Sequence, residues 1–169
     1  MTEEHFWTLV QAPDFHATPD EISDNLKNKL EQLCDSELAD FDKYFNQKMR
    51  ISYTWDLWAA AFIICGCNSE YAFSEFRSWL ISRGRAIFDK ALENPDNLAG
   101  YDVIPVKDEQ PYPYLDEYDL LAGQIYENRN EDELPFVPSG VDEPQGKRFK
   151  NKAKFLKLQY PELFKLYWQ

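Results

Sequence analysis

Tyrosine and carboxylate side chains are concentrated between residues 112 and 119. Asp116 and Asp119 are three residues apart, so on a helix they share one face. Two carboxylates on one face are able to bind a divalent cation or to exchange protons with a substrate. The same pair also suits the solvated face and the positive first turn of an amphipathic helix, and this structural interpretation is favoured.

Residues 54–84 form a nearly uninterrupted apolar stretch that holds three of the five tryptophans. An unpaired buried charge is costly, so the few charges in this stretch are expected to have specific partners. The favoured interpretation is a buried core in which Asp56 caps its helix or pairs with an arginine. The functional alternative is a small aromatic-lined pocket. Its candidate residues are Trp55, Asp56, Trp58, Glu75, Arg77 and Trp79.

Cysteine and histidine side chains, the remaining candidates for nucleophiles and metal ligands, are few. Cys65 and Cys67 form a C-x-C pair, but His5 and His16 lie far away in sequence, and a metal site needs more ligands. Two small buried thiols at a helix end are the favoured interpretation, with zinc or redox chemistry as the alternative. The chain has no phosphate-binding glycine loop, no dinucleotide turn and no G-x-S-x-G elbow. We therefore expect no metal and no cofactor, and the sequence leans away from an enzyme.

Apolar residues recur at helical spacing along most of the chain. Residues 18–21, T-P-D-E, combine a capping threonine, a proline at the first helical position and an acid three residues after the cap, which predicts a helix start. Thr54 marks a further start, and Gly66 is a C-terminal stop. Strand signals are weak throughout. We predict the all-α class, as a compact array of several helices with short connections.

The chain is expected to form one domain with three regions: a core over about 2–128, an acidic loop over 130–146 and a basic helical tail over 147–169. Within the core, residues 102–113 hold three prolines and are predicted to be an extended surface linker. Residues 114–129 are predicted to form a helix.

Charge is distributed unevenly around a net value of −12. Residues 101–144 carry 12 acidic against 2 basic side chains, whereas residues 145–169 carry 7 basic against 1 acidic. A globally acidic chain is a poor nucleic-acid binder, and the basic tail is able to pair with the chain's own acids. An acidic surface favours a basic partner through electrostatic steering, although acidity also serves solubility alone.

The amino terminus carries acids where a signal peptide needs basic residues, and no apolar run approaches the ~18 residues of a membrane span. We therefore expect a cytoplasmic protein with no membrane or nucleic-acid partner. The sequence leaves the oligomeric state open.

Four motifs resemble a bacterial family catalogued as domain of unknown function number 4240. They are F-W-x-L-V at residues 6–10, Y-x-W-D-L-W-A-A-A at 53–61, F-x-x-F-R-x-W-L-I-x-x-G-R at 73–85 and A-L-E-N-P-D-N-L-A at 91–99. The likeness covers roughly residues 3–128 and implies a fold unit but no reaction. It is also similar in style to small accessory proteins encoded near bacterial toxin systems, an association that carries no mechanism. The acidic loop and the lysine-rich tail lie outside the resemblance.

Two functions of different classes follow. The first is an acidic interaction protein, most concretely an immunity- or antitoxin-like inhibitor that binds a basic bacterial effector domain, because tyrosines supply anchoring area and acids supply steering. Its predicted interface is Tyr112, Tyr114, Asp116, Glu117, Tyr118, Asp119, Glu131, Asp132 and Glu133. The alternative is an enzyme or small-molecule binder that uses the tryptophan-lined pocket. A scaffold that oligomerises through its aromatic helices is a third interpretation.

Overall fold

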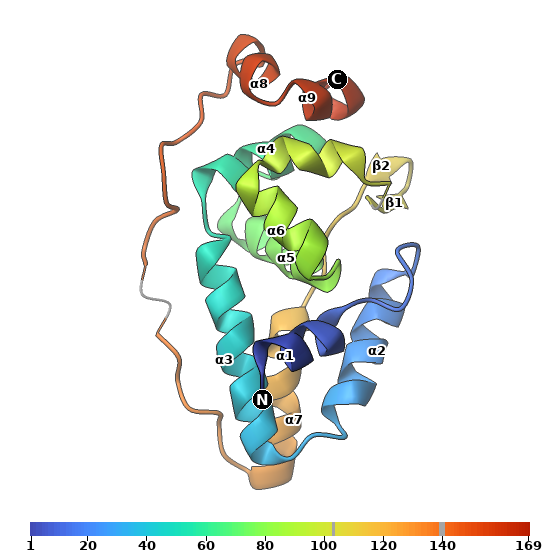
Figure 1. Ribbon diagram of the computed structural model, residues 1–169, viewed down its shortest axis with the longest axis vertical. Coiled ribbons are helices and arrows are strands. Elements are labelled where there is room, and N and C mark those ends of the chain that lie inside the picture. Colours follow the sequence, from blue (N-terminus) through green and yellow to red (C-terminus); the bar gives the residue numbers. More distant parts are fainter. Residues whose placement is uncertain (103, 139–140) are drawn as a thin grey trace.

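The computed structural model describes residues 1–102, 104–138 and 141–169, and its regular structure is almost entirely helical, which confirms the all-α class (Figure 1). The short helical turns η1 and η2 are 3₁₀ helices. In chain order the helices are α1 Glu3–Val10, α2 Pro19–Leu30, α3 Asp35–Ile51, α4 Trp55–Cys65, α5 Glu70–Ser82, α6 Arg85–Glu93, η1 Pro95–Gly100, η2 Tyr118–Leu120, α7 Leu121–Asn130, α8 Ala153–Gln159 and α9 Pro161–Tyr167.

Local capping chemistry explains where several helices begin and end. Thr18 caps α2 through a reciprocal pair of bonds with Glu21, the arrangement that the T-P-D-E motif predicted. The hydroxyl of Thr54 accepts from the amide of Leu57 at the start of α4. Gly66 ends α4 with φ at +67°, a left-handed conformation that glycine adopts without steric cost.

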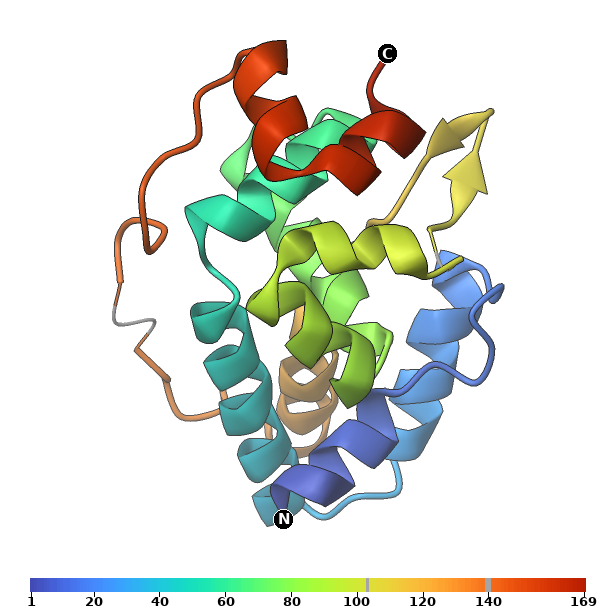
Figure 2. The ribbon, with the colours of Figure 1, turned by 45° about the horizontal axis from the view of Figure 1, so that its top comes forward.

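The helices are arranged in three tiers along the long axis (Figures 1 and 2). Helices α1, α2, α3 and α7 form the lower tier, in which α7 packs against both α2 and α3. The middle tier is α4, α5, α6 and η1. Above it, α9 packs against α4 and η1, and α8 packs against α9. The amino terminus is at the bottom and the carboxyl terminus at the top.

A continuous aromatic core joins the lower and middle tiers. Phe6, Phe73, Phe76 and Phe88 have no exposed surface, and Trp79 is 1% exposed. Helix α4 is apolar around most of its circumference, which is typical of a helix buried on several sides. The structural interpretation of the apolar stretch is therefore correct for most of its residues.

The sequence prediction is wrong in two places. Residues 114–129 do not form one helix: a bend at 116–117 is followed by η2, and α7 begins only at Leu121. The predicted linker contains a small antiparallel hairpin of β1, Val106–Lys107, and β2, Gln110–Pro111. Its turn residues Asp108 and Glu109 both have positive φ, a conformation that carries no strong sequence signal for these residue types.

We call residues 145–169, beyond the acidic loop, the arm. Gln145 forms backbone hydrogen bonds with Tyr53 and Trp55, which fixes the start of the arm beside α4. At its far end the carboxylate of Asp96 accepts from the amides of Glu162 and Leu163, at 3.2 and 2.8 Å. The arm is thus bound to the rest of the chain at both ends.

Candidate protein-binding surface

Residues 112–119 lie across α5. The amide of Leu115 donates to the carbonyl of Glu75 at 3.2 Å, and the side chain of Leu115 is buried. Next to this anchor, the hydroxyl of Tyr71 donates to the carboxylate of Asp116 at 2.6 Å. Asp116 and Glu117 are exposed, and Tyr71 keeps 67% of its surface exposed. This end of α5 therefore presents a tyrosine and several carboxylates to solvent.

The three tyrosines of the predicted interface differ in exposure. Tyr118 is only 2% exposed, packs against Phe45 and donates to the carbonyl of Val10, so its assignment to an interface is wrong. Helical spacing over 114–129 places Tyr118 among the buried positions, and its interface assignment rested only on the acids and tyrosines beside it. Tyr114 is half-buried with its hydroxyl 2.9 Å from the thiol of Cys65, and Tyr112 is half-buried at the hairpin.

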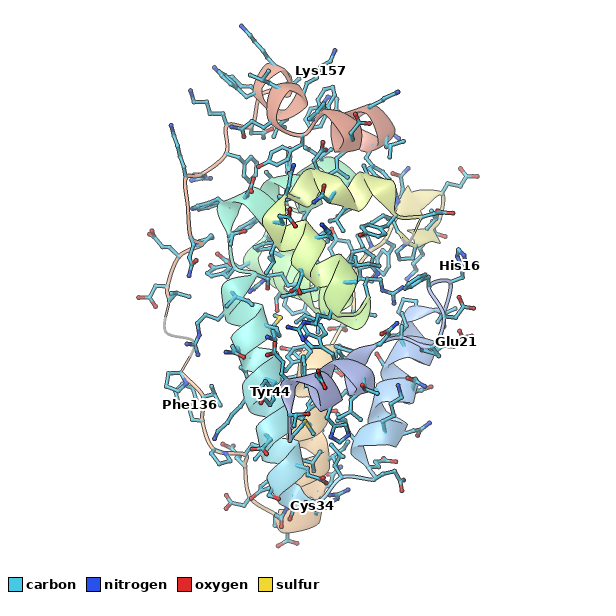
Figure 3. The ribbon with its side chains drawn as sticks, viewed as in Figure 1. His16, Glu21, Cys34, Tyr44, Phe136 and Lys157 are labelled. Carbon is cyan, nitrogen blue, oxygen red and sulfur yellow. The ribbon has the colours of Figure 1, made fainter. Side chains whose placement is uncertain are left out.

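A groove opens on the other side of Asp119, between α3, the start of α7 and the segment 133–137. It encloses about 500 Å³, and four carboxylates line it: Asp42, Asp119, Glu127 and Glu133. Apolar side chains border them, among which Leu120 is 50% and Phe136 86% exposed. Figure 3 shows Phe136 on the outer segment that passes beside α3. Asp42 and Glu127 were missed by the sequence analysis because only the packing of α7 against α3 brings them together.

Burial affects the protonation of these acids. Burial raises the pKa of Asp42 above its ordinary range. Asp119 is exposed at the groove edge, yet surrounding atoms displace enough water to raise its pKa, and the negative charge of Asp116 adds to the effect. Burial likewise raises the pKa of Glu75, next to Asp116. Within the part of the chain that the structure describes, none of these acids is in an ion pair.

We call the combined surface the acidic face. Asp119 links its two halves, because it lines the groove and is close enough to Asp116 and Glu117 for their charges to raise its pKa. Glu131 and Asp132 are also exposed, at the end of α7. The members of the acidic face are Asp42, Tyr71, Glu75, Asp116, Glu117, Asp119, Leu120, Glu127, Glu133 and Phe136.

The tryptophan-lined residues do not meet in one cavity. Trp79 is enclosed in the core, while Trp58 is 8% exposed and its indole donates to the carbonyl of Cys67. The carboxylate of Asp56 accepts from the hydroxyl of Tyr160 in the arm, so the expected arginine partner is wrong. Glu75 faces Asp116 on the acidic face instead.

Arg77 has a structural role in the core. It is 8% exposed, donates to the carbonyls of Met49 and Phe73, and stacks 4.7 Å from the ring centre of Tyr53. Burial lowers the pKa of Arg77 to about 10, so it stays charged at neutral pH. Backbone carbonyls and aromatic faces take the place of a carboxylate partner.

A small hollow of about 210 Å³ does remain beside Trp55 and Trp58, and Phe149 of the arm lines it. The arm therefore narrows the space that a ligand of the tryptophan-lined region would occupy.

The structural interpretation of two buried thiols at a helix end is correct for Cys67, whereas Cys65 is half-buried. Cys65 ends α4 and Cys67 is buried, and burial raises the pKa of these thiols to about 11 and about 12. The described ranges contain no group of three or more His, Cys, Asp or Glu side chains arranged to hold a metal ion. Nor does any described helix combine the length and apolarity that a membrane crossing requires.

Fold and surface together define an all-α protein with a continuous acidic face and a separately attached arm. A family model described as "Protein of unknown function (DUF4240)" matches residues 1–128, and the chain belongs to this family. The match ends within α7, so the acidic loop and the arm lie beyond it. No curated protein and no solved structure matches the chain.

Proposed function

We propose that this protein is a protein-binding module whose acidic face docks a basic surface of a partner. The observation that carries the proposal is the grouping of unpaired, partly desolvated carboxylates with exposed aromatic and apolar side chains. A carboxylate that is partly removed from water and has no cation beside it is destabilised in its ionised form. A Lys or Arg of a partner would compensate for that lost hydration. Tyr71 and Phe136 would supply the anchoring area that interfaces need.

The specific form we put forward is an immunity- or antitoxin-like inhibitor of a basic bacterial effector domain. Support comes from the charge of −12 and from the acidic face, which suits occlusion of a positively charged effector surface. Cys67 is buried, and Arg77 and Asp56 form hydrogen bonds with other groups of the fold. These side chains therefore have structural partners, which favours a binding protein over an enzyme that uses them.

The decisive variant replaces Asp116, Glu117 and Asp119 together with Lys. Tagged protein is first used to isolate a partner from the native host at low and at high salt, and association with that purified partner is then measured by surface plasmon resonance. The triple variant should associate at least about tenfold more slowly at low salt, because steering is lost, and its association rate should depend less on salt.

A matched control replaces Asp24, Asp89 and Glu93, exposed acids of α2 and α6, with Lys. This control makes the same change in net charge away from the acidic face and should slow association much less. Equal slowing in both variants would show that only net charge matters, and unchanged affinity in the first variant would remove the acidic face as the interface.

A further inference from the structure

The arm carries a positive charge that the rest of the chain does not neutralise. The arm holds 7 basic residues and only 1 acidic residue. Across the described residues, none of the seven forms an ion pair with a carboxylate. The arm folds back onto the core, but its cations do not pair with the chain's own acids there, although the sequence left that pairing open. An uncompensated cluster of cations in a protein of net charge −12 calls for an explanation.

Part of this charge surrounds a hollow of about 270 Å³. Its lining is Lys147, Arg148, Phe149, Lys150, Phe155 and Gln159, which combines three cations, two phenyl rings and one amide with no carboxylate. Charges of one sign around a concave surface repel each other, and the folded arm bears this cost in every molecule that lacks a bound anion.

The lining is held in place by contacts to the core. The ring of Phe149 packs against Trp55 and Phe62, with centroids 6.3 and 5.8 Å apart. The guanidinium of Arg148 lies 5.2 Å from the centre of the Trp55 ring, and the ammonium of Lys150 lies 4.5 Å from that of Phe155. These contacts orient two of the three cations before any ligand arrives, which reduces the entropy lost on binding.

We propose that this hollow is a nucleotide-binding site. Arg and Lys side chains are the usual partners of phosphate oxygens, and three of them suit a diphosphate better than a single carboxylate. The phenyl rings of Phe149 and Phe155 offer an apolar wall for a base, and the amide of Gln159 is able to donate and accept hydrogen bonds at a base edge. The hollow is slightly smaller than the ~300 Å³ at the lower end of ligand pockets, so part of a bound nucleotide would stay in solvent.

This site is independent of the proposed function. The arm lies at the top of the molecule and α7, which carries part of the acidic face, at the bottom (Figure 1). No carboxylate lines the hollow itself, so no acid within it competes with a phosphate. The site also lies outside residues 1–128, the part of the chain that the family model matches.

The test is titration of the full chain with ADP in about 150 mM NaCl, followed by calorimetry and by tryptophan fluorescence. Arg148 lies against Trp55, so a phosphate bound to the guanidinium places a negative charge near the indole and should change its emission. We expect a Kd tighter than about 1 mM. Lys147→Gln with Lys150→Gln should weaken binding at least about tenfold, because charge-assisted bonds to phosphate are lost.

The matched control is Lys154→Gln with Lys165→Gln, which removes the same charge from exposed arm positions outside the hollow. It should bind ADP within about twofold of the native chain. Equal weakening in both double variants would overturn the proposal, since binding would then reflect only the charge of the arm. Absence of ADP binding would overturn it as well, and so would inorganic phosphate that binds as tightly as ADP, because the base would then make no contact.

Discussion

At the scale of single residues, the carboxylates fall into two groups with opposite effects on stability. Burial raises the pKa of Asp42 in the groove, so its charged form opposes folding. The ammonium of Lys48 lies 2.6 Å from the carboxylate of Glu3 and lowers the pKa of Glu3, so that charged form favours folding. A carboxylate that opposes folding at neutral pH is typical of a binding site rather than of a structural pair.

Asp42→Asn should therefore stabilise the protein at pH 7. The pKa of Asp42 is higher in the folded state than its unfolded value of about 3.9, so protonated Asp42 favours folding. This stabilisation is fully present below the unfolded pKa and is lost as pH rises through the folded pKa. The gain at pH 7 should be below about 1 kcal/mol and should vanish near pH 4. Urea denaturation at both pH values measures it.

Glu3→Gln serves as the opposite case. Its lowered pKa means that the carboxylate contributes stability above its unfolded pKa, and that the contribution disappears as pH falls through the folded value. This variant should be less stable than the native chain at pH 7 and closer to it at low pH. If Asp42→Asn also lowered the stability at pH 7 and had less effect at low pH, as expected for Glu3→Gln, Asp42 would not lie in a desolvated groove without a cation.

At the scale of elements, the first part of the arm is held by the aromatic side chain of Phe149. Phe149 packs between Trp55 and Phe62, whereas Phe136 of the acidic loop is 86% exposed. Phe149→Ala should loosen the arm, with faster amide exchange over residues 145–160 and little change over α1 to α3. Because Phe149 is half-buried, the lost apolar contacts should cost about 1–2 kcal/mol in the local opening free energy.

Phe136→Ala is the matched control, because it deletes the same ring from a solvated position. Hydrogen exchange read by mass spectrometry should show no loosening of the arm in this variant. If the two replacements gave the same exchange pattern, the arm would not be held through Phe149.

The elements also show how far the sequence determines the fold. Helix ends set by local chemistry, such as Thr18 with Glu21 or Gly66 after α4, were predictable because cap and helix lie within a few residues. The hydrogen bonds of Tyr118 to Val10 and of Tyr160 to Asp56 were not, since they join residues 108 and 104 positions apart. The acidic half of the site near Asp116 was visible as a charge run, whereas the groove required the packing of α7 on α3.

At the scale of the whole molecule, charge of opposite sign is concentrated at two places: the acidic face and the arm. The chain has a net charge of −12, and several of the ion pairs in the described part of the chain are exposed. Exposed pairs contribute little, so the balance of surface electrostatics is repulsive. Repulsion between like charges destabilises a compact state.

Added salt should therefore raise the thermal stability. Between about 10 mM and about 150 mM NaCl the screening length falls from about 30 Å to about 8 Å, which suppresses long-range repulsion among the acids. We expect the Tm to rise by about 2–4 °C, which corresponds to about 1 kcal/mol in a chain of this size. Calorimetry of the variant with Lys at 116, 117 and 119 should show a smaller rise, because each replacement removes a negative charge and adds a positive one. A Tm that fell with salt would mean that attractive pairs, rather than the crowded acids, dominate the surface.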